Sequence, residues 1–224
     1  MDMAKTVKRL VSKWGHPRIA VFGDCILDEY IEVKNGRLSD NWPQPSYDYQ
    51  RTTYEPGGCA GVASLLAGFG ANVDLTSTLP LCKETTLLRQ SLMFRGVETE
   101  HPHEDGGYLS VKTRIMGVAE AGSKRPLLRF GRTIGKFLDT KHIRNIDFSK
   151  YDGVVFVGHS QVANGVFHQV ENYRGEVPYF VDSKECNCLR NRGMFLFPNR
   201  YELAASQLGP VSPETREMQE LVSY

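Results

Sequence analysis

The alternation of short apolar runs with helix-like segments in the second half of the chain most constrains the fold. Residues 151–158 (YDGVVFVG) and 177–184 (VPYFVDSK) are apolar runs of strand length, and residues 163–175 between them have helical spacing. A strand–helix–strand unit of this kind makes two parallel strands. Residues 194–199 (MFLFPN) and 200–209 (RYELAASQLG) continue the alternation. The pattern predicts an α/β fold with a doubly wound, mostly parallel sheet.

The first half of the chain fits the same sheet. A strand is predicted for RIAVFGD, which starts at Arg18, and a glycine turn, a helix closed by Gly70 and a strand near Val73 are predicted after it. Three further elements are expected, namely a helix over 84–94, an extended pair over 108–118 and 125–132, and a short helix over 139–146.

Residues 30–55 differ from the rest of the chain because they are rich in proline, tyrosine and alternating polar residues. This composition predicts a small β flap, a lid-like insertion. With 224 residues the chain is expected to form a single domain over 1–224 that carries this insertion.

The amino-acid composition indicates which classes of binding partner the chain is suited to. Lysine and arginine total 27 against 26 acidic residues, a net charge of +1, which predicts neither nucleic-acid nor membrane binding and favours a small-molecule partner. Five cysteines, an odd number, indicate a reducing, cytoplasmic compartment. The chain has no apolar run of membrane-spanning length, and residues 1–14 are expected to pack on the domain surface.

Polar residues at the carboxyl ends of strands are the first candidates for a site, because open α/β sheets bind ligands there. Asp24 and Asp28 follow the first strand, and their carboxylates can accept hydrogen bonds from sugar hydroxyls. Gly57 and Gly58 precede a helix and leave the backbone open to a hydroxyl or a phosphate. A capping aspartate and a plain tight turn are the structural alternatives.

Two later strand ends carry residues suited to a nucleotide. Asp182 and Lys184 are placed to hold a triphosphate or metal-bound water, and Asn199 and Glu202 offer oxygen ligands to magnesium. Ordinary helix capping is the alternative for each pair.

Other polar residues favour structural roles. Cys186 and Cys188 have no second ligand pair at zinc spacing, and four histidines have no attached nucleophile motif, namely His101, His103, His159 and His168. The sequence contains neither a Walker phosphate loop nor GxGxxG after the first strand.

Taken in order, seven motifs resemble the PfkB (ribokinase-type) carbohydrate kinases: GDCILD, the proline-rich flap, EPGGCAGVASLLAGFGA, KTRIM with LLRF, YDGVVFVG, VDSK and FPNRYE. The flap is similar to the heptose-7-phosphate kinase domain of bifunctional ADP-heptose synthases. The resemblance implies a ribokinase-like fold, a cytoplasmic enzyme that uses ATP and Mg²⁺, a sugar or sugar-phosphate substrate, and a homodimer formed through the lid.

The resemblance also assigns roles. It places Asp28, Gly57 and Gly58 at the sugar, and Lys112, Arg114 and Arg129 near the sugar or its phosphate. Asp24, at the end of the strand, and Gly61, at the position of a sugar-contacting residue, are further candidates for substrate binding. It places Asp182 and Lys184 beside the nucleotide phosphates, and Asn199 and Glu202 at the magnesium and the nucleotide.

The sequence departs from the family pattern at several positions. Gly61 replaces a sugar-contacting asparagine, Gly131 replaces an aspartate typical of the heptose branch, and residues 159–160 and 163–164 differ from that branch as well. The Gly-Ala-Gly-Asp motif, which supplies the anion hole and the general base, is missing from the chain, so its catalytic C-terminal portion is expected to be absent. Losing both groups removes many orders of magnitude of rate, so no turnover is expected from this polypeptide alone.

These observations lead to two specific hypotheses about function and to a third, more general one. The chain is part of an ATP-dependent sugar or sugar-phosphate kinase, or it is a catalytically dead sugar-binding or dimerisation module. The third is a doubly wound domain with an unrelated small-ligand role, since this architecture hosts many functions.

Overall fold

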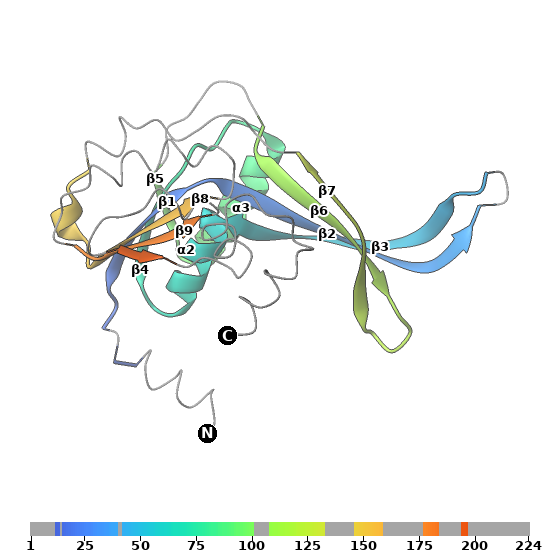
Figure 1. Ribbon diagram of the computed structural model, residues 1–224, viewed down its shortest axis with the longest axis horizontal. Helices are drawn as coiled ribbons and strands as arrows, with labels where there is room; N and C mark the ends of the chain where they lie inside the picture. Colours follow the sequence, from blue (N-terminus) through green and yellow to red (C-terminus); the bar gives the residue numbers. More distant parts are fainter. Residues whose placement is uncertain are drawn as a thin grey trace, which may run out of the picture.

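The computed structural model describes residues 12–13, 15–39, 42–100, 108–132, 146–158, 177–183 and 194–196. These residues form two sheets, a large one with helices against it and a smaller one that projects away from it (Figure 1). None of the helices in this part of the chain has the length and apolar character needed to cross a bilayer.

The large sheet is parallel and contains six strands in the order β10-β9-β8-β1-β4-β5. Its strands are β1 (Arg18–Gly23), β4 (Asn72–Thr76), β5 (Glu98–Glu100), β8 (Gly153–Gly158), β9 (Tyr179–Ser183) and β10 (Met194–Leu196). The central strands β1 and β8 are apolar and almost wholly buried, as expected of parallel strands covered on both faces. The predicted α/β class and mostly parallel sheet are confirmed.

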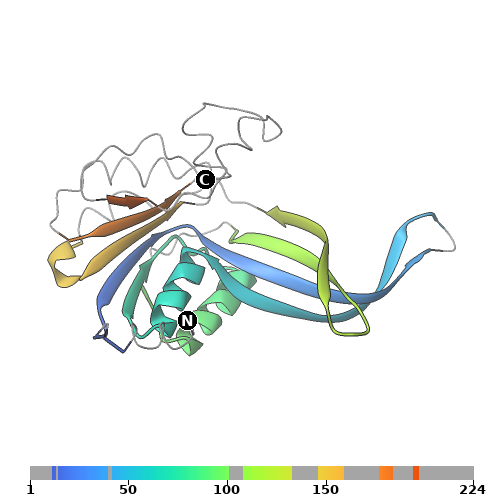
Figure 2. The same ribbon diagram turned by 60° about the horizontal axis from the view of Figure 1, so that its bottom comes forward.

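Helices α2 (Cys59–Gly68) and α3 (Lys83–Phe94) lie together on one face of this sheet (Figure 2). Small residues such as Ala60 and Ala63 let α2 approach the strands closely, and they share one core cluster with Val21 and Leu75. Gly70, at φ 90°, follows the end of α2, as predicted.

The opposite face of the sheet has its own core. Phe22 stacks on Phe156 with ring centroids 5.3 Å apart, and Val181 belongs to the same cluster. The short 3₁₀ helix η1 (Phe148–Lys150) packs there through Phe148. The helices predicted over 163–175 and 200–209, the helix predicted over 139–146 except for Ile146, and most of residues 1–14 lie outside the described residues.

The small sheet, here called the lid sheet, has four strands in the order β3-β2-β6-β7. They are β2 (Cys25–Leu38), β3 (Pro45–Gly58), β6 (Ser110–Val118) and β7 (Lys124–Arg132). The β2–β3 and β6–β7 pairs are antiparallel, and β2 pairs with β6 in parallel. The extended segment expected over 30–55 thus lies within a longer hairpin, and the later extended pair completes its sheet.

A buried carboxylate links three strands of the lid sheet. Glu32 on β2 is only 7% exposed and accepts two hydrogen bonds of 3.0 Å from Arg51 on β3 and one of 2.6 Å from Lys124 on β7. Hydrogen bonds from Arg51, then Lys124, lower the pKa of Glu32 to about 2. The ion cluster therefore ties the two hairpins of the lid sheet together.

Because the pKa of Glu32 is lower in the folded protein than in the unfolded chain, its stabilising effect is present above about pH 5 and is lost as the pH falls towards about pH 2. We expect Glu32→Gln to lower the urea midpoint of unfolding at neutral pH. In acid the midpoint of the variant should approach that of the wild type. Asp48→Asn removes an exposed carboxylate of the lid sheet that pairs with Arg37, and it should lower the urea midpoint less than Glu32→Gln does. Equal midpoints for wild type and Glu32→Gln at neutral pH would contradict this role.

Candidate functional site

The two sheets join where the chain leaves β1. Gly23 has φ 144°, and a Cβ atom there would lie 2.0 Å from the carbonyl oxygen of Val157 on β8. The next residue, Asp24, donates its backbone N–H to the same oxygen at 3.4 Å, and its own carbonyl accepts the N–H of Cys59 at 3.1 Å. The backbone of Asp24 thus connects β1, β8 and the start of α2.

The paired glycines fit against this junction. Gly58 has φ 58°, and a Cβ atom there would lie 2.2 Å from the carbonyl oxygen of Asp24. A Cβ atom on Gly57 would lie 2.3 Å from Oδ2 of Asp28, so the Asp28 carboxylate covers bare backbone. The structure therefore brings together the predicted residues Asp24, Asp28, Gly57 and Gly58.

Asp28 is held by a guanidinium. Nη1 of Arg114 donates a hydrogen bond of 2.6 Å to Oδ1 of Asp28, and both side chains are partly buried. The hydrogen bond to Asp28 raises the pKa of Arg114. The guanidinium carbon also lies 5.2 Å from the centre of the Tyr30 ring. Asp28 is thereby fixed in one orientation, with Oδ2 lying above Gly57.

The other predicted cations share this face of the lid sheet. Lys112 is the direct cross-strand partner of Asp28, and Arg129 is the partner of Arg114. Directly opposed residues point to the same side of a sheet, so these three cations line one surface with two carboxylates, Asp28 and its cross-strand partner on β3, Glu55. Such a surface suits a ligand with hydroxyls and a phosphate.

Gly61 lies in the first turn of α2, where a Cβ atom would be 3.0 Å from the carbonyl oxygen of Pro56. Adding any side chain here requires the backbone to shift by a few tenths of an ångström. A glycine at this position thus allows α2 to lie close to the end of β3.

Asp182 lies at the same edge of the large sheet as Gly23. In the register, Gly23 pairs with Val157 and Val157 pairs with Asp182, so Asp182 is two strands, or about 10 Å, from Gly23. From β1 the next strand of this sheet along the chain is β4 on one side, and from β8 it is β9 on the other side. The topological switch point, where open sheets bind ligands, therefore lies between β1 and β8 at this edge. The predicted Lys184, Asn199 and Glu202 lie outside the described residues.

Sequence reasoning missed Ser77, which follows β4 and is 1% exposed. Its Oγ accepts the N–H of Cys25 at 3.2 Å, next to a close Cys25–Cys59 contact of 3.4 Å between the sulfur atoms. Burial raises the pKa of Cys59. The run of polar residues at the end of β4, Thr76–Ser77–Thr78, could have pointed to Ser77, because polar residues at the carboxyl ends of strands are site candidates, as they were for Asp24.

Solved structures share this fold. A carbohydrate kinase from Agrobacterium tumefaciens aligns with a TM-score of 0.60 at 13% identity, over 92% of this chain and 66% of that one. A ribokinase from Arabidopsis thaliana, complexed with ribose and ATP, aligns with a TM-score of 0.55 at 17% identity, over 92% and 67%. The fold is therefore that of the ribokinase-type carbohydrate kinases.

Sequence comparison leads to a narrower group. The chain is 27% identical over 215 residues to the bifunctional protein HldE of Koribacter versatilis, covering 91% of this chain and 42% of that protein. It is 28% identical over 194 residues to HldE of Nitratiruptor, covering 83% and 40%. The chain is thus a relative of HldE proteins and spans about two fifths of their length. No model of a protein family matches it.

The junction makes a specific prediction about its glycines. Gly58→Ala combines a left-handed backbone with a collision at the Asp24 carbonyl, whereas Gly122→Ala has a similar φ of 79° but nothing within 4 Å. We expect Gly122→Ala to lower the free energy of unfolding by about 1–2 kcal/mol and Gly58→Ala to lower it clearly more, measured by urea unfolding. Equal losses in the two variants would show that the junction is not tightly packed.

Proposed function

We propose that this chain forms the sugar-binding part of a carbohydrate kinase and binds a sugar or a sugar phosphate on the Asp28 face of the lid sheet. Its similarity to HldE proteins and its ribokinase-type fold support a carbohydrate kinase-like function. The observation that carries the proposal is the Asp28 carboxylate, oriented by Arg114 over the bare backbone of Gly57.

Each group has a distinct task in this proposal. Asp28 accepts hydrogen bonds from sugar hydroxyls, and Gly57 leaves room for the Asp28 carboxylate to lie against the backbone. Arg114, Lys112 and Arg129 supply positive charge to a phosphate substituent, which favours a phosphorylated sugar over a neutral one. Heptose 7-phosphate is the substrate that we propose on the basis of the HldE relationship.

ATP and Mg²⁺ belong to the proposal as the co-substrate and its metal. Among the structural relatives, one ribokinase was solved with ADP and another with ribose and ATP. Asp182 lies at the same sheet edge as Gly23, two strands away, where a phosphate chain would meet the sugar. In our proposal Lys184 joins it at the phosphates, and Asn199 and Glu202 hold the metal.

We further propose that this polypeptide alone does not turn over. The sequence contains no Gly-Ala-Gly-Asp motif, so the groups that would deprotonate the acceptor hydroxyl and stabilise the transferring phosphoryl group are missing from it. Sugar binding and phosphoryl transfer should therefore be separable in this chain.

Calorimetry with heptose 7-phosphate tests the sugar site. We expect wild type to bind, and Asp28→Asn to weaken binding by about 10- to 100-fold, the effect of a lost charge-assisted hydrogen bond. The matched control is Asp48→Asn, since Asp48 also pairs with an arginine of the lid sheet but lies at its far end. Equal affinities of the two variants, or phosphoryl transfer from ATP–Mg²⁺ by the wild-type chain, would contradict the proposal.

A second candidate function, a non-catalytic sugar-binding and dimerisation module, is favoured by the other face of the lid sheet. The cross-strand register puts four large exposed side chains on that face, namely Tyr49, Tyr54, Leu128 and Phe130. Their exposure ranges from 36% to 63%, and exposed apolar side chains gathered on one face often mark an interaction surface. We propose that a second copy of the chain covers this face in a homodimer.

Sedimentation tests the dimer. We expect the wild-type chain to be dimeric at micromolar concentration and Leu128→Glu/Phe130→Glu to be monomeric, because two carboxylates would be buried without partners. Leu65→Glu, at a residue that is 60% exposed on α2, serves as the control and should leave the dimer intact. A monomeric wild type would exclude lid-mediated dimerisation.

A further inference from the structure

The lid sheet contains a strand that is longer than its neighbour. Pairing of β2 with β6 ends at Val33 and Gly117, whereas pairing of β2 with β3 continues to Leu38 and Pro45, with a bulge between Lys34 and Arg37. Figure 1 shows the β2–β3 hairpin continuing beyond the point where β6 and β7 bend away. In the described part of the chain, residues 34–38 therefore have a strand partner on one edge only.

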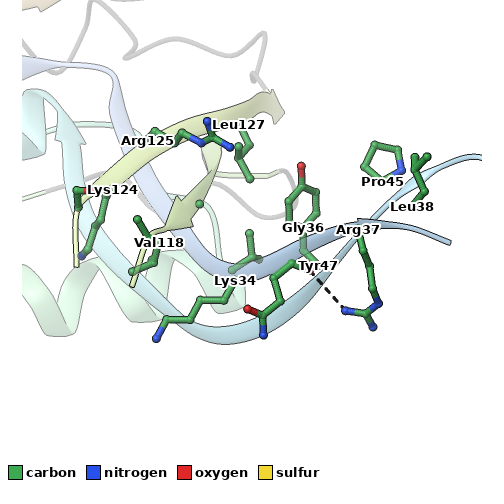
Figure 3. Close-up of a pocket in the computed structure, with 15 residues that line it drawn as sticks. Lys34, Gly36, Arg37, Leu38, Pro45, Tyr47, Val118, Lys124, Arg125 and Leu127 are labelled. Atoms are coloured by element: carbon green, nitrogen blue, oxygen red, sulfur yellow. Dashed lines mark hydrogen bonds between the residues drawn. The ribbon is translucent and has the colours of Figure 1, made fainter. Parts of the chain in front are cut away.

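A groove occupies the place that a longer β6 would fill. Its volume is about 670 Å³, and it is lined by all of residues 34–38 on one side and by the β6–β7 turn on the other (Figure 3). Leu38, Val118 and Leu127 supply apolar surface. The Tyr47 ring covers Gly36, where a Cβ atom would lie 2.6 Å from Cε1 of the tyrosine.

The groove carries positive charge. Its lining includes Lys34, Arg37, Lys124 and Arg125 and no aspartate or glutamate. Arg37 pairs with Asp48 at 2.9 Å, and Lys124 pairs with Glu32 at 2.6 Å. Lys34 and Arg125 are exposed and make no ion pair with any residue that the structure describes. Two cations, one on each wall, thus have no acidic partner.

We propose that this groove binds an extended, acidic peptide segment of a partner protein, which adds to the lid sheet as a strand along residues 34–38. A free strand edge supplies main-chain hydrogen bonds, and alternate side-chain contacts supply specificity, as in other cases of strand addition. The basic walls select acidic side chains. A small anion fits less well, because the four cations lie apart around the groove and do not converge on one point (Figure 3).

The site is separate from the proposed sugar site. The groove lies at the far end of β2, whereas Asp28 lies near its start, and the proposal does not require the chain to bind a sugar. Its failure would therefore leave the proposed function untouched, and the converse also holds.

Fluorescence anisotropy with labelled nine-residue peptides tests the proposal. We expect a peptide of alternating Glu and Val to bind, its Gln–Val counterpart to bind at least about tenfold more weakly, and a version with proline at alternate positions not to bind. Lys34→Glu/Arg125→Glu should weaken binding of the acidic peptide by at least about tenfold. Lys83→Glu/Lys150→Glu carries the same charge change on exposed lysines outside the groove and should bind like wild type.

Three outcomes would overturn the proposal. The first is equal binding of the acidic and neutral peptides, and the second is equal binding of the acidic peptide by the two double variants. The third is a wild-type dimer that Lys34→Glu/Arg125→Glu abolishes, because a second copy of the chain would then be the occupant.

Discussion

The close packing of backbone at the end of β1 is the constraint on which the rest of the structure depends. The Asp24 carbonyl accepts the N–H of Cys59, and Gly23 and Gly58 approach neighbouring carbonyls more closely than any side chain permits. This packing fixes the angle at which β2 leaves the large sheet. The lid sheet, the Asp28 carboxylate and the start of α2 all take their positions from it.

The lid sheet has two chemically different faces because its strands alternate. One face carries Asp28 with Arg114 and the other proposed sugar and phosphate contacts, and the opposite face carries exposed aromatic and aliphatic side chains such as Phe130. The Glu32 cluster holds the hairpins together so that both faces keep their shape. We propose that the lid sheet offers one face to a ligand and the other to a second copy of the chain.

Local patterns predicted the large sheet and part of the site. Apolar runs such as 151–158 and the helix of small residues after Gly58 can be recognised from the sequence alone. Asp24 and Asp28 were selected because they lie at the carboxyl end of a predicted strand. Pairings between distant segments could not be predicted in this way, because Asp28 and Arg114 are 86 positions apart. The burial of Glu32 was missed because an isolated carboxylate in an alternating strand indicates a solvent-exposed face. The roles of Lys184, Asn199 and Glu202 remain predictions.

Hydrogen–deuterium exchange with and without heptose 7-phosphate tests most directly whether the junction and the Asp28 face form the sugar site. We expect slower exchange in amides of residues 55–60 and 110–115, which flank Asp28, and unchanged exchange in α3 on the other side of the lid sheet. Protection confined to α3, or no protection in either segment around Asp28, would contradict it.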